Sequence, residues 1–252
     1  MRIQFCSDLH LEFPENAAYL KTNPLEVLGE VLIIAGDLVP FSQLNDHLPI
    51  IQSICEPFQQ VYWLPGNHEY YYYDLQHRSG TLEEKILPNL TLINNQSVTI
   101  KNIELVFSTL WTHISPLKAF NIQNKLSDFF VIKNRGQQLD VEAYNHLHTQ
   151  SLQFIKNALE NSQEKTQVVI THHCPTFHHY PKQYAGSPIN EAFAVELEEM
   201  IVDFKPKHWI YGHTHINTPT FKLSDTQLYT NQLGYVRHNE HSHFKRSAVI
   251  EL

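Results

Sequence analysis

The sequence has few cysteines, no cluster of basic residues and no long apolar run. Its three cysteines, Cys6, Cys55 and Cys174, form no C-x-x-C motif, so the chain offers neither a disulfide framework nor a cysteine-bound zinc site. This low, odd count is typical of reduced thiols and predicts a cytoplasmic location. No stretch reaches the roughly 20 apolar residues of a membrane span, and no signal-peptide pattern is evident, so we expect no membrane association.

Acidic residues outnumber basic ones, with 26 Asp and Glu against 18 Lys and Arg, and the formal net charge is −8. An acidic chain without runs of Lys or Arg gains no attraction to a phosphate backbone, so extended nucleic-acid binding is not expected. The 252 residues, 42% of them hydrophobic, suit one globular domain over residues 1–252. No feature of the sequence predicts an oligomeric state.

Short apolar runs alternate with amphipathic stretches along the chain. The apolar runs predict strands at residues 3–6, 31–35, 61–64, 98–100, 104–107, 168–170, 209–211, 226–229 and 248–250. Helices are expected at residues 42–55, 82–87, 141–159 and 191–204, the last with Asn190 as its N-cap. Residues 111–135 have no clear period and are interpreted as a loop or cap. This pattern predicts an α/β fold, with a mixed sheet or two packed sheets and helices outside.

Polar residues follow five of the apolar runs, where each strand is expected to end. They are Asp8-Leu9-His10, Gly36-Asp37, Gly66-Asn67-His68, Thr171-His172 and Gly212-His213-Thr214-His215. Residues two apart on an extended chain point the same way, so two such side chains can grip one metal ion. Ligands bind at the carboxyl ends of strands in α/β folds, and we therefore predict that the five pieces form one site for two divalent metal ions.

The residue types in these pieces indicate the metal and the chemistry. Asp, Asn and His suit Mn, Fe, Zn or Co better than Ca, which prefers oxygen ligands alone. Two metal ions about 3.5–4 Å apart need a bridging oxygen, and Asp37 is the candidate bridge. Such a pair clamps two phosphate oxygens, holds a hydroxide between the ions and stabilises the charge of the transition state. The sequence does not decide between Mn, Fe and Zn.

In their order along the chain, the five pieces resemble the five sequence blocks of the calcineurin-like metallophosphoesterases, and they span nearly the whole sequence. The resemblance implies a four-layer α/β/β/α sandwich of two mixed sheets flanked by helices. It implies two ligand sets that share Asp37: Asp8, His10 and His215 for one ion, and Asn67, His172 and His213 for the other. It also implies that His68 lies beside the phosphate as a general acid or transition-state stabiliser.

Two positions near these blocks have alternatives. His173 is the alternative ligand to His172, and we favour His172 because it comes first after the strand. Glu12 and Glu69 are expected to make hydrogen bonds around the site rather than to catalyse.

Substrate contacts are expected from Asn67, His68 and Trp111. A wall that sets specificity is a further hypothesis for the loop or cap, because such loops often carry function; its candidates are Trp111, His113, Asp128 and Phe129. Near the C-terminus, Asn231-Gln232-Leu233-Gly234-Tyr235 resembles the Asn-Pro-x-Gly-Tyr segment of a bacterial subgroup, with Gln232 in place of the proline. The resemblance to that subgroup does not indicate which substrate the protein acts on.

The favoured function is a dinuclear-metal phosphohydrolase that cleaves a small phosphomonoester or phosphodiester by attack of a metal-bound hydroxide. The alternative is a silent binding or scaffold module, because a fold alone never proves an activity. That alternative is weakened because the chain retains the full set of candidate ligands. A nuclease is a third hypothesis, and the net charge of −8 argues against it.

Overall fold

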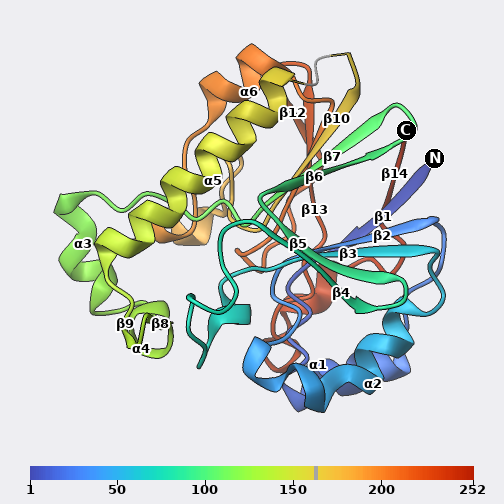
Figure 1. Cartoon of the computed structure of the whole chain (residues 1–252), viewed down its shortest axis with the longest axis horizontal. Coiled ribbons are helices and arrows are strands. Elements are labelled where there is room, and N and C mark those ends of the chain that lie inside the picture. Colours follow the sequence, from blue (N-terminus) through green and yellow to red (C-terminus); the bar gives the residue numbers. More distant parts are fainter. Residues whose placement is uncertain (162–163) are drawn as a thin grey trace.

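The computed structural model describes residues 1–161 and 164–252, and its framework is a pair of six-stranded sheets packed face to face (Figure 1). The first sheet has the order β14 (Val249–Glu251), β1 (Arg2–Cys6), β2 (Val31–Ala35), β3 (Gln60–Leu64), β5 (Leu90–Asn94) and β4 (Leu82–Leu87). The second sheet has the order β12 (Phe221–Leu223), β13 (Thr226–Thr230), β11 (His208–Tyr211), β10 (Thr166–Thr171), β7 (Ile103–Ser108) and β6 (Gln96–Ile100).

Both sheets are mixed, with parallel strands in the middle and antiparallel strands at the edges. In the first sheet β1, β2, β3 and β5 are parallel, and in the second sheet β7, β10, β11 and β13 are parallel. Continuous apolar runs such as Val31–Ala35 are buried throughout, as expected of strands covered on both faces. The parallel arrangement brings the carboxyl ends of the central strands to one end of each sheet.

Helices complete the four layers that the sequence predicts. Figure 1 shows α1 (Pro14–Thr22) and α2 (Leu44–Cys55) on one side of the two sheets, and α5 (Val141–Asn161) and α6 (Glu198–Phe204) on the other. The apolar core between the sheets includes Ile33, Phe107 and Ile170. Among the described helices, none is both long enough and apolar enough to cross a membrane.

A small cap stands beside this sandwich on the left of Figure 1. It comprises α3 (Pro116–Gln123), α4 (Asp128–Val131) and a hairpin of β8 (Lys133–Asn134) and β9 (Gln137–Gln138). Buried Ile122, Phe129 and Leu139 join the cap to the apolar cluster that also contains Tyr144 of α5. The cap therefore occupies the segment for which no period was recognisable in the sequence.

The helix expected at residues 82–87 is wrong, because this segment is strand β4. Its side chains alternate between half-buried and exposed, and it pairs antiparallel with β5, a strand that was not predicted. Leu, Glu and Lys favour helix in isolation, but the pairing with β5 outweighs this preference. The other expected strands are confirmed, including the β6–β7 hairpin.

The helix expected at residues 191–204 is also partly wrong. Helix α6 covers only Glu198–Phe204, and Asn190 begins a short 3-10 turn instead of capping it. The reason is a backbone pairing: Cys174 N donates to Phe193 O at 3.2 Å, and Val195 N donates to Cys174 O at 3.0 Å. The helices expected at 42–55 and 141–159 are confirmed as α2 and α5; Pro49 lies on the exposed face of α2.

Candidate metal centre

The loops after five strands carry the polar side chains that the sequence singled out. They follow β1 (Asp8 and His10), β2 (Asp37), β3 (Asn67 and His68), β10 (His172) and β11 (His213 and His215). Backbone bonds hold neighbouring loops together: Asp8 N donates to Gly36 O, and Gly212 N donates to His172 O, both at 2.9 Å. Both sheets thus contribute to one site.

Five of these residues have a left-handed backbone. The φ angles are 56° at Asp8, 47° at His10, 55° at Asp37, 75° at His213 and 55° at His215. For a residue other than glycine this conformation costs about 1–2 kcal/mol. Such strain collects at functional sites, where the surrounding structure holds it in place. In this chain the left-handed residues lie directly after β1, β2 and β11.

Glycines beside the site leave room for the candidate ligands. A Cβ atom at Gly36, whose φ is +94°, would lie 2.1 Å from Nδ1 of His172. A Cβ atom at Gly66 would lie 2.2 Å from Oδ1 of Asp37. Any larger residue at either position would displace a side chain of the site, and this explains the glycine in each of these blocks.

The first half of the centre consists of Asp8, His10 and His215. The Nε2 atoms of the two histidines lie 2.9 Å apart. Their Nδ1 atoms face carboxylates, Glu12 for His10 at 3.2 Å and Glu240 for His215 at 2.8 Å. Each Nδ1 atom therefore carries the proton, and each Nε2 atom presents a lone pair. Two lone pairs face each other at this distance, and a cation between them would remove the repulsion.

The second half consists of Asn67, His172 and His213. Nδ1 of His172 donates to the carbonyl of Ala35 at 3.0 Å, so Nε2 is the atom that can bind a metal ion once its own proton has left. That atom lies 3.2 Å from Oδ1 of Asn67 and 3.1 Å from Nδ1 of His213. Burial lowers the pKa of His213 well below its usual value and keeps it neutral, which is the form that binds metal.

Asp37 lies between the two halves. Its Oδ1 atom accepts a hydrogen bond from the backbone N–H of His68 at 2.9 Å. Its Oδ2 atom lies 3.7 Å from Nε2 of His10 and 3.4 Å from Nε2 of His172. Burial alone would lower the pKa of His172, but the charge of Asp37 raises this pKa to about 10. Asp37 is thus the carboxylate common to both halves.

The donor atoms fit metal ions. Two sets of side chains each bring one ligand atom per residue to within 4.8 Å of the others in the set. The first set is Asp8, His10, Asp37 and His215, and the second is Asp37, His172 and His213. Oxygen and imidazole donors in such sets suit Mn, Fe or Zn. Asn67 adds a carbonyl oxygen to the second set. All seven predicted ligands therefore converge in the fold.

His68 lies at the edge of the first half. Its Nδ1 atom contacts Oε1 of Glu12 at 3.0 Å, and its Nε2 atom lies 3.4 Å from the hydroxyl of Tyr235. The ring stacks on Tyr71, with centroids 4.0 Å apart. Burial alone would lower its pKa, but the Asp37 and Glu12 carboxylates raise it to about 9. The imidazole is thereby held in the charged form that can give up a proton.

The structure distinguishes His172 from its neighbour. Nδ1 of His173 contacts the carbonyl of Thr109 at 3.1 Å, and His173 belongs to neither ligand set. Burial, reinforced by His172, lowers the pKa of His173 to about 3. Its ring packs against Trp111 and His213 with centroids 5.4 and 4.3 Å apart. His173 thus supports the site from behind, and the geometry favours His172 as the ligand.

Trp111, which the sequence predicted as a substrate contact, is buried. Its side chain is 2% exposed and packs on the rings of Tyr70, Tyr144 and His173. The large apolar indole is thus part of the core beneath the cap, and its position does not support contact with a substrate. Asn67 and His68 remain the predicted substrate contacts.

Carboxylates around the centre were recognised only in part. Glu69 accepts hydrogen bonds from Asp37 N, Gly66 N and Trp63 Nε1 and so ties two loops together, as its predicted supporting role requires. Glu240, the partner of His215, was missed, because 25 residues separate the two and no local motif joins them. Asp128 was considered for a wall but contacts Asn67 instead.

Comparison with known proteins decides the family. The sequence model of the calcineurin-like phosphoesterases matches residues 1–217 of this chain. The chain belongs to the calcineurin-like phosphoesterase family. The match confirms the family that the five blocks resemble. The four-layer fold that this resemblance implied is confirmed as well. Together with the cluster of Asp and His side chains, family membership implies bound metal ions and suggests a hydrolase.

Two proteins that resemble this calcineurin-like phosphoesterase, one in sequence and one in fold, match nearly its whole length. Uncharacterized protein L509 of Acanthamoeba polyphaga mimivirus is 31% identical over an alignment of 281 positions, gaps included, which covers 100% of this chain and 97% of that protein. The crystal structure of phosphopantetheinyl hydrolase (PptH) from Mycobacterium tuberculosis has a TM-score of 0.71 and 14% identity, covering 98% of this chain and 95% of its own. At that identity the likeness shows the fold alone.

Proposed function

We propose that this calcineurin-like phosphoesterase is a dinuclear-metal phosphohydrolase that cleaves a phosphomonoester or phosphodiester. The observation that carries the proposal is the position of Asp37 Oδ2, which faces one histidine of each half, His10 and His172. In this assignment Asp8, Asp37, His10 and His215 hold one ion. The other ion is held by Asp37, Asn67, His172 and His213.

Mn, Fe or Zn at these positions would polarise the phosphate oxygens and lower the pKa of a coordinated water. The chain itself supplies the remaining functions. Asp37 fixes the spacing of the two halves, and Glu12 and Glu240 orient the imidazoles of the first half. His68 points Nε2 toward the Tyr235 hydroxyl and away from Glu12, so it is placed to give a proton to the leaving oxygen.

The proposed substrate is a small phosphorylated molecule rather than a long nucleic acid. The net charge of −8 opposes the capture of an extended phosphate backbone. Aromatic rings beside the first half support a compact organic leaving group: Tyr235 contacts the ring of His215 at 4.5 Å, and Tyr71 stacks on His68 at 4.0 Å. Monoesters and diesters are both compatible with this surrounding.

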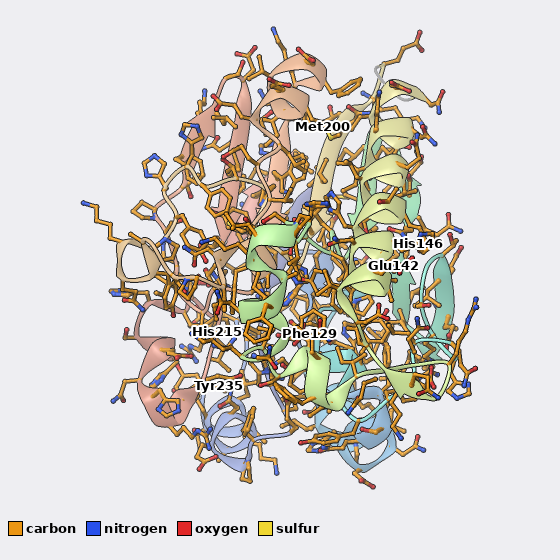
Figure 2. All side chains as sticks on the ribbon, turned by 90° about the vertical axis from the view of Figure 1, so that its left-hand side faces the viewer. Phe129, Glu142, His146, Met200, His215 and Tyr235 are labelled. Carbon is orange, nitrogen blue, oxygen red and sulfur yellow. The ribbon has the colours of Figure 1, made fainter. Side chains whose placement is uncertain are left out.

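The test uses purified protein loaded with Mn(II) and two substrates, p-nitrophenyl phosphate and bis(p-nitrophenyl) phosphate. Wild type is expected to hydrolyse at least one of them and to contain two metal ions per chain. Asp37→Ala should show neither property, whereas His146→Ala should match wild type, because His146 lies exposed on α5 (Figure 2). A metal-loaded wild type that hydrolyses neither ester would contradict the proposal.

A further inference from the structure

Asp128 begins α4 of the cap, yet its side chain is only 1% exposed. Its Oδ1 atom accepts hydrogen bonds from Nδ2 of Asn67 at 3.0 Å and from the hydroxyl of Tyr71 at 2.9 Å. One buried carboxylate therefore joins the cap to two residues beside the candidate metal centre.

The contact with Asn67 fixes the orientation of that amide. An ionised carboxylate only accepts hydrogen bonds, so the amide nitrogen of Asn67 must face Asp128. The carbonyl oxygen then faces the second half of the centre, 3.2 Å from Nε2 of His172. The opposite orientation would place an NH2 group among the ligand atoms, where it has no lone pair for a metal ion.

The contact with Tyr71 reaches His68. The two rings are stacked with their planes 24° apart, and the Tyr71 hydroxyl is held at its far end by Asp128. Glu12 holds Nδ1 on the edge of the same imidazole. His68 is thus fixed on one face and at one edge, with Nε2 on the opposite edge, 3.4 Å from the Tyr235 hydroxyl.

Backbone bonds keep the cap in register with the loop that carries these residues. Tyr72 N donates to Val131 O at 2.9 Å, Lys133 N donates to Tyr73 O at 3.0 Å, and Leu75 N donates to Lys133 O at 2.8 Å. In Figure 2 the cap lies toward the viewer, with Phe129 near the level of His215. Asp128 consequently has one fixed place relative to Asn67 and Tyr71.

We infer that Asp128 is a positioning residue, which orients the amide of Asn67 toward the second metal ion and, through Tyr71, holds the imidazole of His68. The inference rests on the proposed function. It gives the cap a role in setting the geometry of the centre.

The experiment combines Mn(II) titration of metal-free protein with hydrolysis of phenyl and p-nitrophenyl esters of the class that wild type cleaves. Asp128→Ala should weaken one of the two Mn(II) binding steps by about 10–100-fold. Tyr71→Phe should leave both binding steps unchanged and should lower kcat more for the phenyl ester, because phenolate leaves less readily without a proton. Asp128→Asn still offers an oxygen acceptor and should fall between Asp128→Ala and wild type.

The control is Asp203→Ala, which removes an exposed carboxylate from α6 and should match wild type in both measurements. Equal Mn(II) affinities in Asp128→Ala, Asp203→Ala and wild type would overturn the inference. If Asp128→Ala does not fold, unchanged affinity in Asp128→Asn together with an unchanged leaving-group dependence in Tyr71→Phe overturns it. A wild type that binds Mn(II) but hydrolyses no ester refutes the proposed function alone, because the titration still decides whether Asp128 orients Asn67.

Discussion

The two halves of the candidate metal centre use similar ligands but are held in different ways. In the first half, the carboxylates of Glu12 and Glu240 accept hydrogen bonds from Nδ1 of His10 and His215. In the second half, Nδ1 of His172 donates its hydrogen bond to an uncharged backbone carbonyl. A charged partner makes an imidazole a more basic ligand, and we therefore expect the first half to bind its metal ion more tightly.

The candidate ligands are buried or nearly so, and His215 is the most accessible of them. Its side chain is 12% exposed, whereas those of His10 and His172 are 0% exposed. Aromatic rings gather beside the first half, where Tyr235 lies 4.8 Å from the ring of His10 and 4.5 Å from that of His215. The edge of the first half at His215 is thus the side at which we expect a substrate to meet His68.

Removal of Asp37 should disrupt both halves alike, because this carboxylate belongs to both. We expect Asp37→Ala to lose metal from both positions and to show no detectable turnover. Metal analysis and ester hydrolysis measure the two effects in parallel with His146→Ala as the control. An Asp37→Ala protein that keeps two metal ions would show that the halves do not share this ligand.

Removal of His68 should leave both halves intact. His68→Ala is expected to lower kcat by about 10²–10⁴-fold, since it deletes a proton donor but no predicted ligand. Metal content, measured on the same sample, should stay at the wild-type value. An unchanged rate would make His68 a bystander, and a loss of metal would place it among the ligands.

Removal of Glu240 should affect only the first half. Glu240→Ala deletes the acceptor of the His215 Nδ1 proton and should weaken one Mn(II) binding step by about 10–100-fold. Glu142→Ala, on the exposed side of α5 (Figure 2), serves as the control for loss of a carboxylate. If Glu240→Ala weakened both steps equally, the halves would not be held independently.

Crowding at Gly36 should affect the second half and give the smallest change in this series. In Gly80→Ala the new methyl group has no neighbour within 4 Å. The left-handed backbone at this position should therefore be the only cause of strain, and it should destabilise the protein by about 1–2 kcal/mol. In Gly36→Ala the new methyl group also meets His172, which should add about 1–3 kcal/mol. Urea unfolding of both metal-free variants measures the difference, and equal losses would show that the pocket around His172 is loose.

The sequence predicted the ends of the central strands well. Continuous apolar runs such as Val31–Ala35 can be recognised without knowledge of their neighbours, and the polar residue after each run falls at the end of a parallel strand. This is why Asp37 and the other six predicted ligands converge in the structure. Family resemblance then divided them into two sets, and composition alone would not have done so.

Features that depend on distant partners were not predictable. Strand β4 has helix-favouring residues and becomes a strand only through its pairing with β5. The helix does not run on from Asn190 because Ala194 pairs with Cys174 between the 3-10 turn and α6. Glu240 has its role through contact with His215. Asp128 has its role through contact with Asn67, which lies 61 residues away in the sequence. No pattern within a short window contains such information.

The most direct test of the shared centre is a crystal structure of the Mn(II)-loaded protein with anomalous scattering data. We predict two manganese peaks about 3.5–4 Å apart, one on each side of Oδ2 of Asp37. One peak should lie within bonding distance of His10 and His215, and the other within bonding distance of His172 and His213. A single peak, or two peaks that do not share Asp37, would contradict a centre in which Asp37 bridges two metal ions.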